Sequence, residues 1–163
     1  MSWFGAALIR NFEARDASRI ADVFYQAVHI GAKDAYDEEQ RRAWVPNKPD
    51  LNSWEKRIAA QTSKVAVVNE ELIGFMTLTD AGKIDLAFVT PNAMGKGVSD
   101  KLYHAILQDA KAAGHKTLTT EASYLAKSFF KKFGWRVVQQ QVVTRDGVDL
   151  TNFLMELDMS SPH

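Results

Sequence analysis

The apolar positions in the first third of the chain predict a strand followed by helices. Residues 7–12 alternate between apolar and polar as a strand does, and Asp16 is placed to cap a helix after them. Two shorter helices are predicted next, one capped by Asp37 and one beginning at Asn52, with two prolines between them. The predicted first helix has apolar residues at helical spacing: Ile20, Val23, Phe24, Ala27 and Val28.

The pattern changes at Lys64 to short runs that are rich in strand-forming residues. Residues 64–69, 72–80 and 83–90 are three such runs, separated only by short polar turns. Consecutive runs of this kind predict hairpins, so we expect three neighbouring antiparallel strands.

A long helical pattern follows this meander. Residues 99–114 carry apolar side chains along one side and end at Gly114, and residues 116–122 then read as a strand. A strand, a helix and another strand predict a right-handed crossover, with residues 84–89 parallel to residues 117–122. The sheet should therefore be mixed.

The last third of the chain predicts one more helix and a closing hairpin. The helix covers residues 126–134 and ends at Gly134. The two strands of the hairpin are residues 135–143 and 150–159, with the turn at residues 145–147. The expected fold class is α/β in the α+β sense: one mixed, mostly antiparallel sheet of about seven strands, flanked by helices.

Composition narrows the picture further. The chain has 163 residues, 46% of them hydrophobic and 25% charged, which fits one domain over residues 1–163 with a single substantial core. Its 20 basic and 20 acidic residues cancel, so no overall field exists to hold nucleic acid or an anionic membrane. Any anion must be bound by local geometry.

Cysteine and histidine usage bears on the possible chemistry. No cysteine is present, which excludes disulfides, thiolate metal sites and a cysteine nucleophile. The histidines at 29, 104, 115 and 163 show no metal-binding spacing, so we expect no metal. Neither a signal peptide nor an apolar run of about 20 residues is seen, and a cytoplasmic protein is expected.

Gly95, Lys96 and Gly97 stand where a strand gives way to a helix. Two glycines there allow backbone N–H groups to converge on an anion, helped by the positive end of the helix dipole. A simple tight connection explains the pattern about as well. A dinucleotide fingerprint would need a third glycine and an earlier position, and the GxxxxGK[ST] phosphate loop is absent.

Several segments resemble the GCN5-related N-acetyltransferase (GNAT) family, and a bacterial YafP-like subgroup within it. The stretch at residues 88–107 resembles the acyl-CoA loop of the family, Q/R-x-x-G-x-G/A, which aligns with residues 94–99. Here Met94 replaces the polar first residue and Ser99 the last small one. Residues 126–135 and the order of the strands also match the family.

This resemblance implies a GNAT fold with a splayed parallel pair at its centre, and acetyl-CoA as co-substrate. In the family a strand amide polarises the thioester carbonyl, and Phe88 and Val89 supply the amides at the matching position. Ser123 stands where the family has an asparagine. The resemblance implies these cofactor-binding residues: Phe88, Val89, Met94, Gly95, Lys96, Gly97, Val98, Ser99, Ser123 and Ser128.

Acetyl transfer to an amine requires a proton to be removed, because an alkyl amine of pKa about 10 is charged at neutral pH. Asp85 and Glu121 lie on the two strands expected beside the thioester, and either could take the proton; a strand-end carboxylate paired with a lysine is the alternative for each. The family often has a tyrosine where Phe130 stands. Tyr124 is therefore the candidate acid, although a half-buried structural tyrosine is equally compatible.

The helical segment before the meander is where the family builds its acceptor pocket. His29, Tyr36, Trp44 and Trp54 are the candidates to line it, and core packing is the alternative for each. The acceptor would be a small-molecule amine or a peptide amine, and a homodimer is possible. We expect direct transfer in a ternary complex; a non-catalytic acyl-CoA-binding module is the alternative, and a nucleotide-dependent oxidoreductase is disfavoured.

Overall fold

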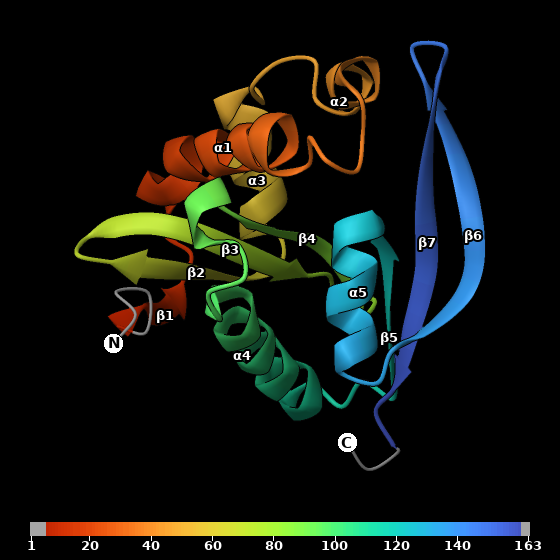
Figure 1. The fold of residues 1–163 in the computed structure, drawn as a ribbon. Helices are drawn as coiled ribbons and strands as arrows, with labels where there is room; N and C mark the ends of the chain where they lie inside the picture. The colour runs from red at the N-terminus through yellow and green to blue at the C-terminus, as the bar shows by residue number, and fades with distance from the viewer. Residues whose placement is uncertain (1–5, 161–163) are drawn as a thin grey trace.

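The structure is a computed structural model that describes residues 6–160, and these residues share one seven-stranded sheet (Figure 1). The strand order is β1-β2-β3-β4-β5-β7-β6, and all neighbours are antiparallel except β4 and β5. This mixed, mostly antiparallel sheet confirms the predicted fold class. The strands are β1 (Leu8–Asn11), β2 (Thr62–Val68), β3 (Glu71–Leu78), β4 (Lys83–Val89), β5 (Thr117–Ala122), β6 (Arg136–Arg145) and β7 (Val148–Asp158).

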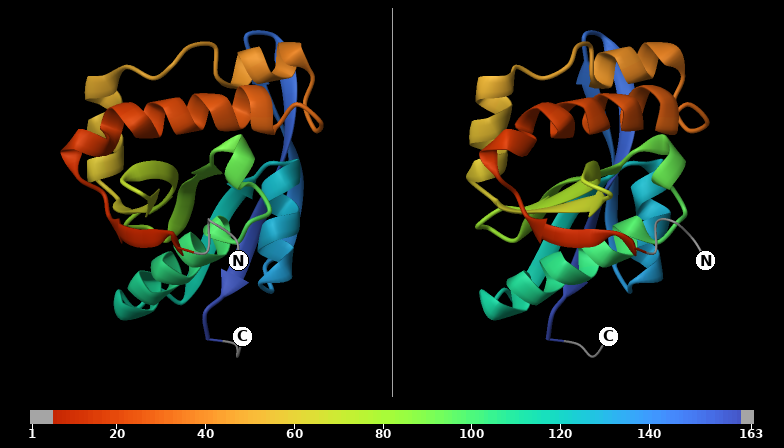
Figure 2. Two further views of the ribbon diagram at one scale, coloured as in Figure 1. Left: turned by 60° about the vertical axis from the view of Figure 1, so that its left-hand side comes forward. Right: turned by 90° about the vertical axis from the view of Figure 1, so that its left-hand side faces the viewer.

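Helices cover both faces of the sheet, as the views in Figure 2 show. On one face α1 (Ala17–Gln26) and α3 (Leu51–Ala59) bury a core around Phe75. On the other face α4 (Val98–Ala112) and α5 (Tyr124–Lys132) bury a larger core. The short helix α2 (Glu38–Trp44) contacts strand β7 of the closing hairpin.

The helix starts differ in detail from those predicted. Helix α3 begins at Leu51, because the carboxylate of Asp50 accepts a hydrogen bond from the Ser53 amide and caps the helix two residues before Asn52. Helix α5 begins at Tyr124, because the Ser123 hydroxyl accepts a hydrogen bond from the Ala126 amide. In both cases the cap lies just before the first apolar residue of the pattern.

Asp16 precedes α1 as predicted, but its carboxylate does not cap that helix. It forms two hydrogen bonds to Arg10, of 2.8 and 2.9 Å, and accepts a third from the Glu13 amide. Burial acts to raise the pKa of Asp16, but these bonds together outweigh it and lower the pKa. The residue joins β1 to the helical layer.

The first helix does not end with α1. Residues Ala27–Gly31 continue it as one turn of π-helix, which the periodicity did not predict. Such turns widen a helix locally and often occur at functional sites. Ala27 and Ala32, at the two ends of this turn, line the cavity described below.

The central parallel pair splays apart, as the family resemblance implied. The β4–β5 ladder registers only Lys83 with Thr119 and Ile84 with Thr120. Beyond these pairs β4 continues in register with β3 up to Val89, while β5 continues with β7 up to Ala122. The two strands therefore follow different neighbours toward their carboxyl ends, and the site lies between them.

The closing hairpin is long and ends in a tight turn. Strand β6 ends at Arg145 and β7 begins at Val148, so the turn consists of Asp146 and Gly147, both with positive φ. This is the two-residue turn that matches the twist of a hairpin. Arg145 is the residue just before this turn, and Figure 1 shows the tip of the hairpin on the same side of the molecule as α2.

Candidate active site

Two cavities lie between the separating ends of β4 and β5, and they share Trp44, Phe88 and Ser123. The first, which we call the loop cavity, has a volume of about 380 Å³ and reaches the glycine loop and α5. The second, the hairpin cavity, has a volume of about 510 Å³ and reaches the tip of β6 and β7. A molecule that spans the shared residues would touch both.

Backbone conformation shapes one end of the loop cavity. Gly95 and Gly97 both have positive φ, of 72° and 86°, and a Cβ added at either would meet nothing within 4 Å. Gly97 is the residue before α4, and the Lys101 amide is bonded to its carbonyl. The backbone N–H groups of residues 98–100, in the first turn of α4, therefore have no acceptor within the helix.

Lys96 contributes less than its position in the motif predicts. Its amide donates to the Ala93 carbonyl at 3.3 Å, so that donor is already engaged within the loop. Lys96 and Val98 are also absent from the cavity lining, whereas Met94, Gly95, Gly97 and Ser99 belong to it. The available donors therefore centre on the helix start.

Met94 occupies the position where a polar residue was expected. A Cβ at Gly31 would lie 3.0 Å from the Met94 sulfur, so the thioether packs directly against the π-helical turn. This contact explains why an apolar residue is acceptable there. It also couples the glycine loop to the segment that precedes α2.

An ion pair stands at the outer part of the loop cavity. Lys132 of α5 contacts both carboxylate oxygens of Asp100, at 3.0 and 3.3 Å, and both residues line the cavity. Phe130, in place of the usual tyrosine, is 1% exposed and packs against Tyr103 and Trp135. It provides an apolar wall with no proton to donate.

Aromatic rings form the wall common to both cavities and continue into the hairpin cavity. The Phe24 ring stacks on Trp54 at 5.1 Å and meets Phe88 edge-on at 4.9 Å, and Trp44 lies 6.2 Å from Phe88. Phe88 lines both cavities, while Val89 lines only the first. The rings thus belong to the core and the site at once.

Tyr36 is buried where three distant segments meet. Its hydroxyl donates to the Thr151 carbonyl at 2.8 Å and accepts from the Tyr124 amide at 3.1 Å. Burial raises the pKa of Tyr36. The phenol is therefore a structural link that also lines the hairpin cavity.

The first of the two predicted carboxylates, Asp85, is fully engaged. Arg57 of α3 binds both of its oxygens, at 3.0 and 3.1 Å, and the Gln61 amide donates to one of them at 2.7 Å. Arg57 also lies over the Trp54 ring, 5.6 Å from its centroid. Asp85 fixes a cation on the cavity wall.

Glu121, the second carboxylate, is paired with Lys83 at 2.8 Å. Its other oxygen lies 3.5 Å from the side-chain amide nitrogen of Gln141. The hydrogen bond from Lys83 is the main reason that the pKa of Glu121 lies below its ordinary value, and the positive charges of Lys83 and Arg145 add to it. Both Lys83 and Glu121 line the hairpin cavity. The carboxylate is ionised at neutral pH.

Some predicted site residues lie outside both linings. Tyr124 is 43% exposed, its ring lies between Tyr36 and Phe153, and neither cavity includes it. Ser128 is exposed on α5. The His29 ring lies 4.2 Å from Tyr25 and bonds to the Val45 carbonyl at 2.6 Å. The roles proposed for these three residues stay predictions.

Sequence reasoning missed the basic side chains of the site. Arg57, Lys83 and Arg145 line the hairpin cavity, and Lys132 lines the loop cavity. Arg57 lies one helical turn after Trp54, so the two share a helix face, and this spacing was a usable signal. No signal at the level of sequence pairs Lys83 with Glu121, because they are 38 positions apart.

Two further observations concern what the described chain does not contain. Within residues 6–160, no group of three or more side chains is arranged to hold a metal ion. Over the same residues, no helix is both long and apolar enough to cross a membrane. The cytoplasmic location stays a prediction.

Comparison with known proteins agrees with this geometry. Residues 32–157 match the family model described as "Acetyltransferase (GNAT) domain". The chain is 31% identical over 147 residues to the uncharacterised N-acetyltransferase YafP of Escherichia coli (strain K12), covering 90% of this chain and 93% of that protein. The chain therefore belongs to the GNAT family, and it is an acyltransferase.

Solved structures show the same fold. The GCN5-related N-acetyltransferase "Aminotransferase, Class-II" from Rhodopseudomonas palustris has a TM-score of 0.88 and 30% identity, covering 93% of this chain and 95% of that one. The PaiA N-acetyltransferase from Thermoplasma acidophilum, in complex with coenzyme A, has a TM-score of 0.74 and 19% identity, covering 94% and 99%. At the lower identity the likeness extends to the fold alone.

Proposed function

We propose that this protein transfers an acetyl group from acetyl-CoA directly to an amine in a ternary complex. The observation that carries the proposal is the pair of cavities that meet at Trp44, Phe88 and Ser123. One cavity has features of an anion-binding loop, and the other has a carboxylate near the junction. The thioester would lie at the junction, with its carrier in the loop cavity and the amine in the hairpin cavity.

The diphosphate of the carrier would bind at the start of α4. Gly95 and Gly97 leave open space beside the backbone, and the amides of residues 98–100 lack intrahelical acceptors. Met94, Lys96 and Ser128 retain a peripheral role in this proposal. Ser123, whose hydroxyl caps α5, would lie beside the thioester end.

In the reaction the amine nitrogen attacks the thioester carbonyl, a C–N bond forms and the C–S bond breaks. The proton of the ammonium must leave before attack, and we assign its removal to Glu121, directly or through a water molecule. Asp85 then serves to hold Arg57, since its two oxygens accept three hydrogen bonds of 2.7, 3.0 and 3.1 Å. Glu121 has only one close bond, from Lys83 at 2.8 Å, and its other oxygen lies 3.5 Å from the Gln141 side chain. The low pKa of Glu121 makes it a charged acceptor at neutral pH.

The sulfur leaves as a thiolate, which is tolerable because a thiol of this kind has a pKa of about 8.5. Tyr124 is the proposed donor of the proton that neutralises it. Its ring is partly exposed beside Tyr36, so reaching the thioester requires the side chain to turn toward the junction. After attack the nitrogen loses a second proton, which would return to Tyr124 through water, while the proton taken by Glu121 goes to solvent. The amide, the free thiol and one released proton are then the balanced products.

The test is release of free thiol from acetyl-CoA in the presence of a panel of primary amines. Thiol release that depends on the amine, with one N-acetylated product per thiol, is the expected result. Phe130 and Met94, which depart from the family pattern, are the reason to consider a non-catalytic acyl-CoA-binding module as the alternative. It would show a rise in melting temperature with acetyl-CoA but no turnover with any amine.

A further inference from the structure

The hairpin cavity carries more positive than negative charge. Its lining contains three basic side chains, Arg57, Lys83 and Arg145, and two acidic ones, Asp85 and Glu121. Two of the basic residues are neutralised in pairs: Arg57 with Asp85 and Lys83 with Glu121. The charge of Arg145 is left over.

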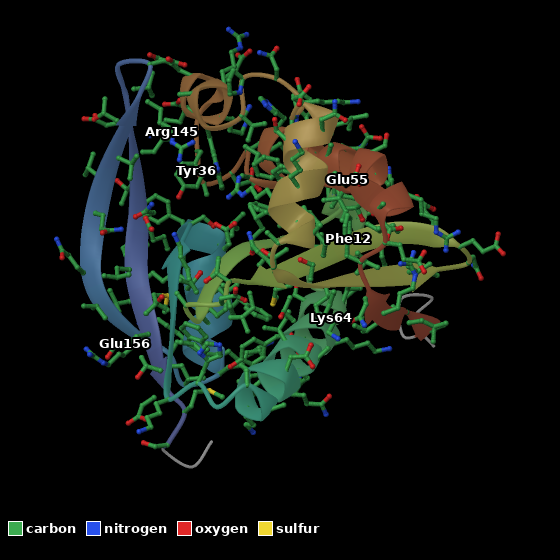
Figure 3. The ribbon with its side chains drawn as sticks, turned by 180° about the vertical axis from the view of Figure 1, so that it is seen from behind. Phe12, Tyr36, Glu55, Lys64, Arg145 and Glu156 are labelled. Atoms are coloured by element: carbon green, nitrogen blue, oxygen red, sulfur yellow. The ribbon has the colours of Figure 1, made fainter. Side chains whose placement is uncertain are left out.

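Arg145 takes part in none of the ion pairs formed within residues 6–160. Its positive charge nevertheless acts on Glu121 across the cavity. Figure 3 shows Arg145 and Tyr36 next to each other, between the hairpin and α2. Arg145 is exposed beside the turn and lines the cavity, and it has no carboxylate partner among the described residues.

The charge of Arg145 suits a ligand that brings an anionic group. A guanidinium only donates hydrogen bonds, and its planar fork matches the two oxygens of a carboxylate. The indole N–H of Trp54, which also has no acceptor among the described residues, is buried away from the open space of the cavity.

A carboxylate, that of Glu121, lies nearer the junction of the two cavities. Glu121 is two residues before Ser123, which belongs to both linings, whereas Arg145 is at the tip of the hairpin. The unpaired positive charge therefore lies toward the tip of the hairpin, and the Lys83–Glu121 pair lies nearer the junction. A dipolar acceptor would place its ammonium beside Glu121 and its anion beside Arg145.

We propose that the acceptor is an amine that also carries a carboxylate, of about the size of an amino acid, and that Arg145 binds this carboxylate. This inference rests on the proposed acetyl transfer and adds the class of acceptor. It disfavours polyamines and other acceptors with a second positive charge, since Arg145 would repel them. The free carboxylate, rather than the amine, would then decide which amines are used.

The experiment compares matched acceptors in the thiol-release assay. Phenylalanine, leucine and 4-aminobutanoic acid are each measured beside the corresponding amide and decarboxylated amine, with spermidine as the cationic comparison. We expect kcat/KM to be roughly ten- to hundredfold higher for the best carboxylate than for its amide. The amino group of an α-amino acid amide is less basic than that of the free amino acid, so more of it is unprotonated at neutral pH. A preference for the free carboxylate would therefore oppose the intrinsic availability of the amine.

Variants then assign the preference to one residue. Arg145→Gln should remove the preference for the carboxylate, and the loss should appear in KM rather than in kcat. Arg136→Gln is the matched control, because Arg136 lies on the same strand but pairs with Glu156 at the other end of the hairpin (Figure 3). The assignment would be overturned if Arg145→Gln retained the preference for the carboxylate. It would also be overturned if Arg57→Gln lost the preference and Arg145→Gln did not.

Failure of the inference can be separated from failure of the proposed function. Turnover of amines without a preference for the carboxylate, or best with spermidine, would overturn the inference and leave acetyl transfer intact. If no amine is turned over, calorimetry on the protein saturated with coenzyme A compares binding of N-acetylphenylalanine and N-acetylphenethylamine. Tighter binding of the former, lost in Arg145→Gln, would support the carboxylate site; equal binding would refute it.

Discussion

The two cavities differ in what builds them. The loop cavity depends at one end on backbone: two glycines at positive φ and the first turn of one helix, all within residues 94–100. The hairpin cavity depends on side chains from several strands and helices, held by pairs such as Lys83 with Glu121. A few substitutions can change which ligand is bound by a site built from scattered side chains. Ligand binding by a site built from one stretch of backbone is less sensitive to side-chain substitution.

The largest effect should follow from placing a charge in the backbone site. Gly97→Asp should lower affinity for coenzyme A by at least about a hundredfold, because the carboxylate would stand where the diphosphate is expected and the left-handed φ strains any side chain. Calorimetry with coenzyme A measures the affinity. The matched control is Gly114→Asp, at the other end of α4, where φ is also positive and the space is open. Unchanged affinity in Gly97→Asp would contradict the proposed loop site.

The next effect concerns the side-chain site alone. Glu121→Gln should lower kcat by about a hundredfold, since a positioned proton acceptor typically contributes 10²- to 10⁴-fold. Affinity for coenzyme A should stay close to that of the wild type, because Glu121 does not line the loop cavity. Single-turnover kinetics and calorimetry separate the two quantities. An equal fall in both would mean that the two cavities are not independent.

A smaller effect is expected at Tyr124. Tyr124→Phe should lower kcat by about tenfold without changing coenzyme A affinity, since a thiolate leaves tolerably well without an acid. Tyr25→Phe, on α1 and outside both linings, is the control and should match the wild type. If kcat in Tyr124→Phe is unchanged across a pH series, Tyr124 is a structural residue and not the acid.

The smallest effect is the dependence of stability on pH. Because the folded-state pKa of Glu121 lies below its ordinary value of 4.5, its pairing with Lys83 stabilises the fold above that pH. The contribution should disappear as the pH falls through the lowered pKa. Urea unfolding of the wild type and Glu121→Gln should therefore differ slightly at pH 7 and converge at acid pH. The difference should be small because Glu121 is 41% exposed. A difference that persists at acid pH would mean that the pair is not its source.

Local patterns predicted most of the fold. Alternation in residues 64–90 gave the meander, and the turn at Asp146 and Gly147 gave the hairpin, because both depend on neighbours in sequence. The π-helical turn at residues 27–31 was missed, because the spacing of apolar residues does not distinguish one such turn from a continuing α-helix. The splay of the parallel pair was expected from the family resemblance, whereas the point at which the ladder ends, after Ile84 and Thr120, was not predicted.

In the candidate site, too, features that depend on neighbours in sequence were predicted, and contacts between distant segments were not. Gly95 and Gly97 were singled out by their spacing together with the family resemblance, and both line the loop cavity. Tyr36, Trp44 and Trp54 line the hairpin cavity. The partners of Asp85 and Glu121 could not be found this way. Arg57 and Lys83 come from other elements, and only the folded sheet shows that they neutralise these carboxylates.

The phenol of Tyr36 has a consequence for redesign of the acceptor specificity. Its single oxygen joins the segment before α2, strand β7 and the first amide of α5, which are far apart in sequence. Segment exchange between related enzymes would therefore succeed only if residue 36 remains a tyrosine or if all three pieces are transplanted together. The proposed acceptor side therefore depends on three segments that are distant in sequence and must be kept together.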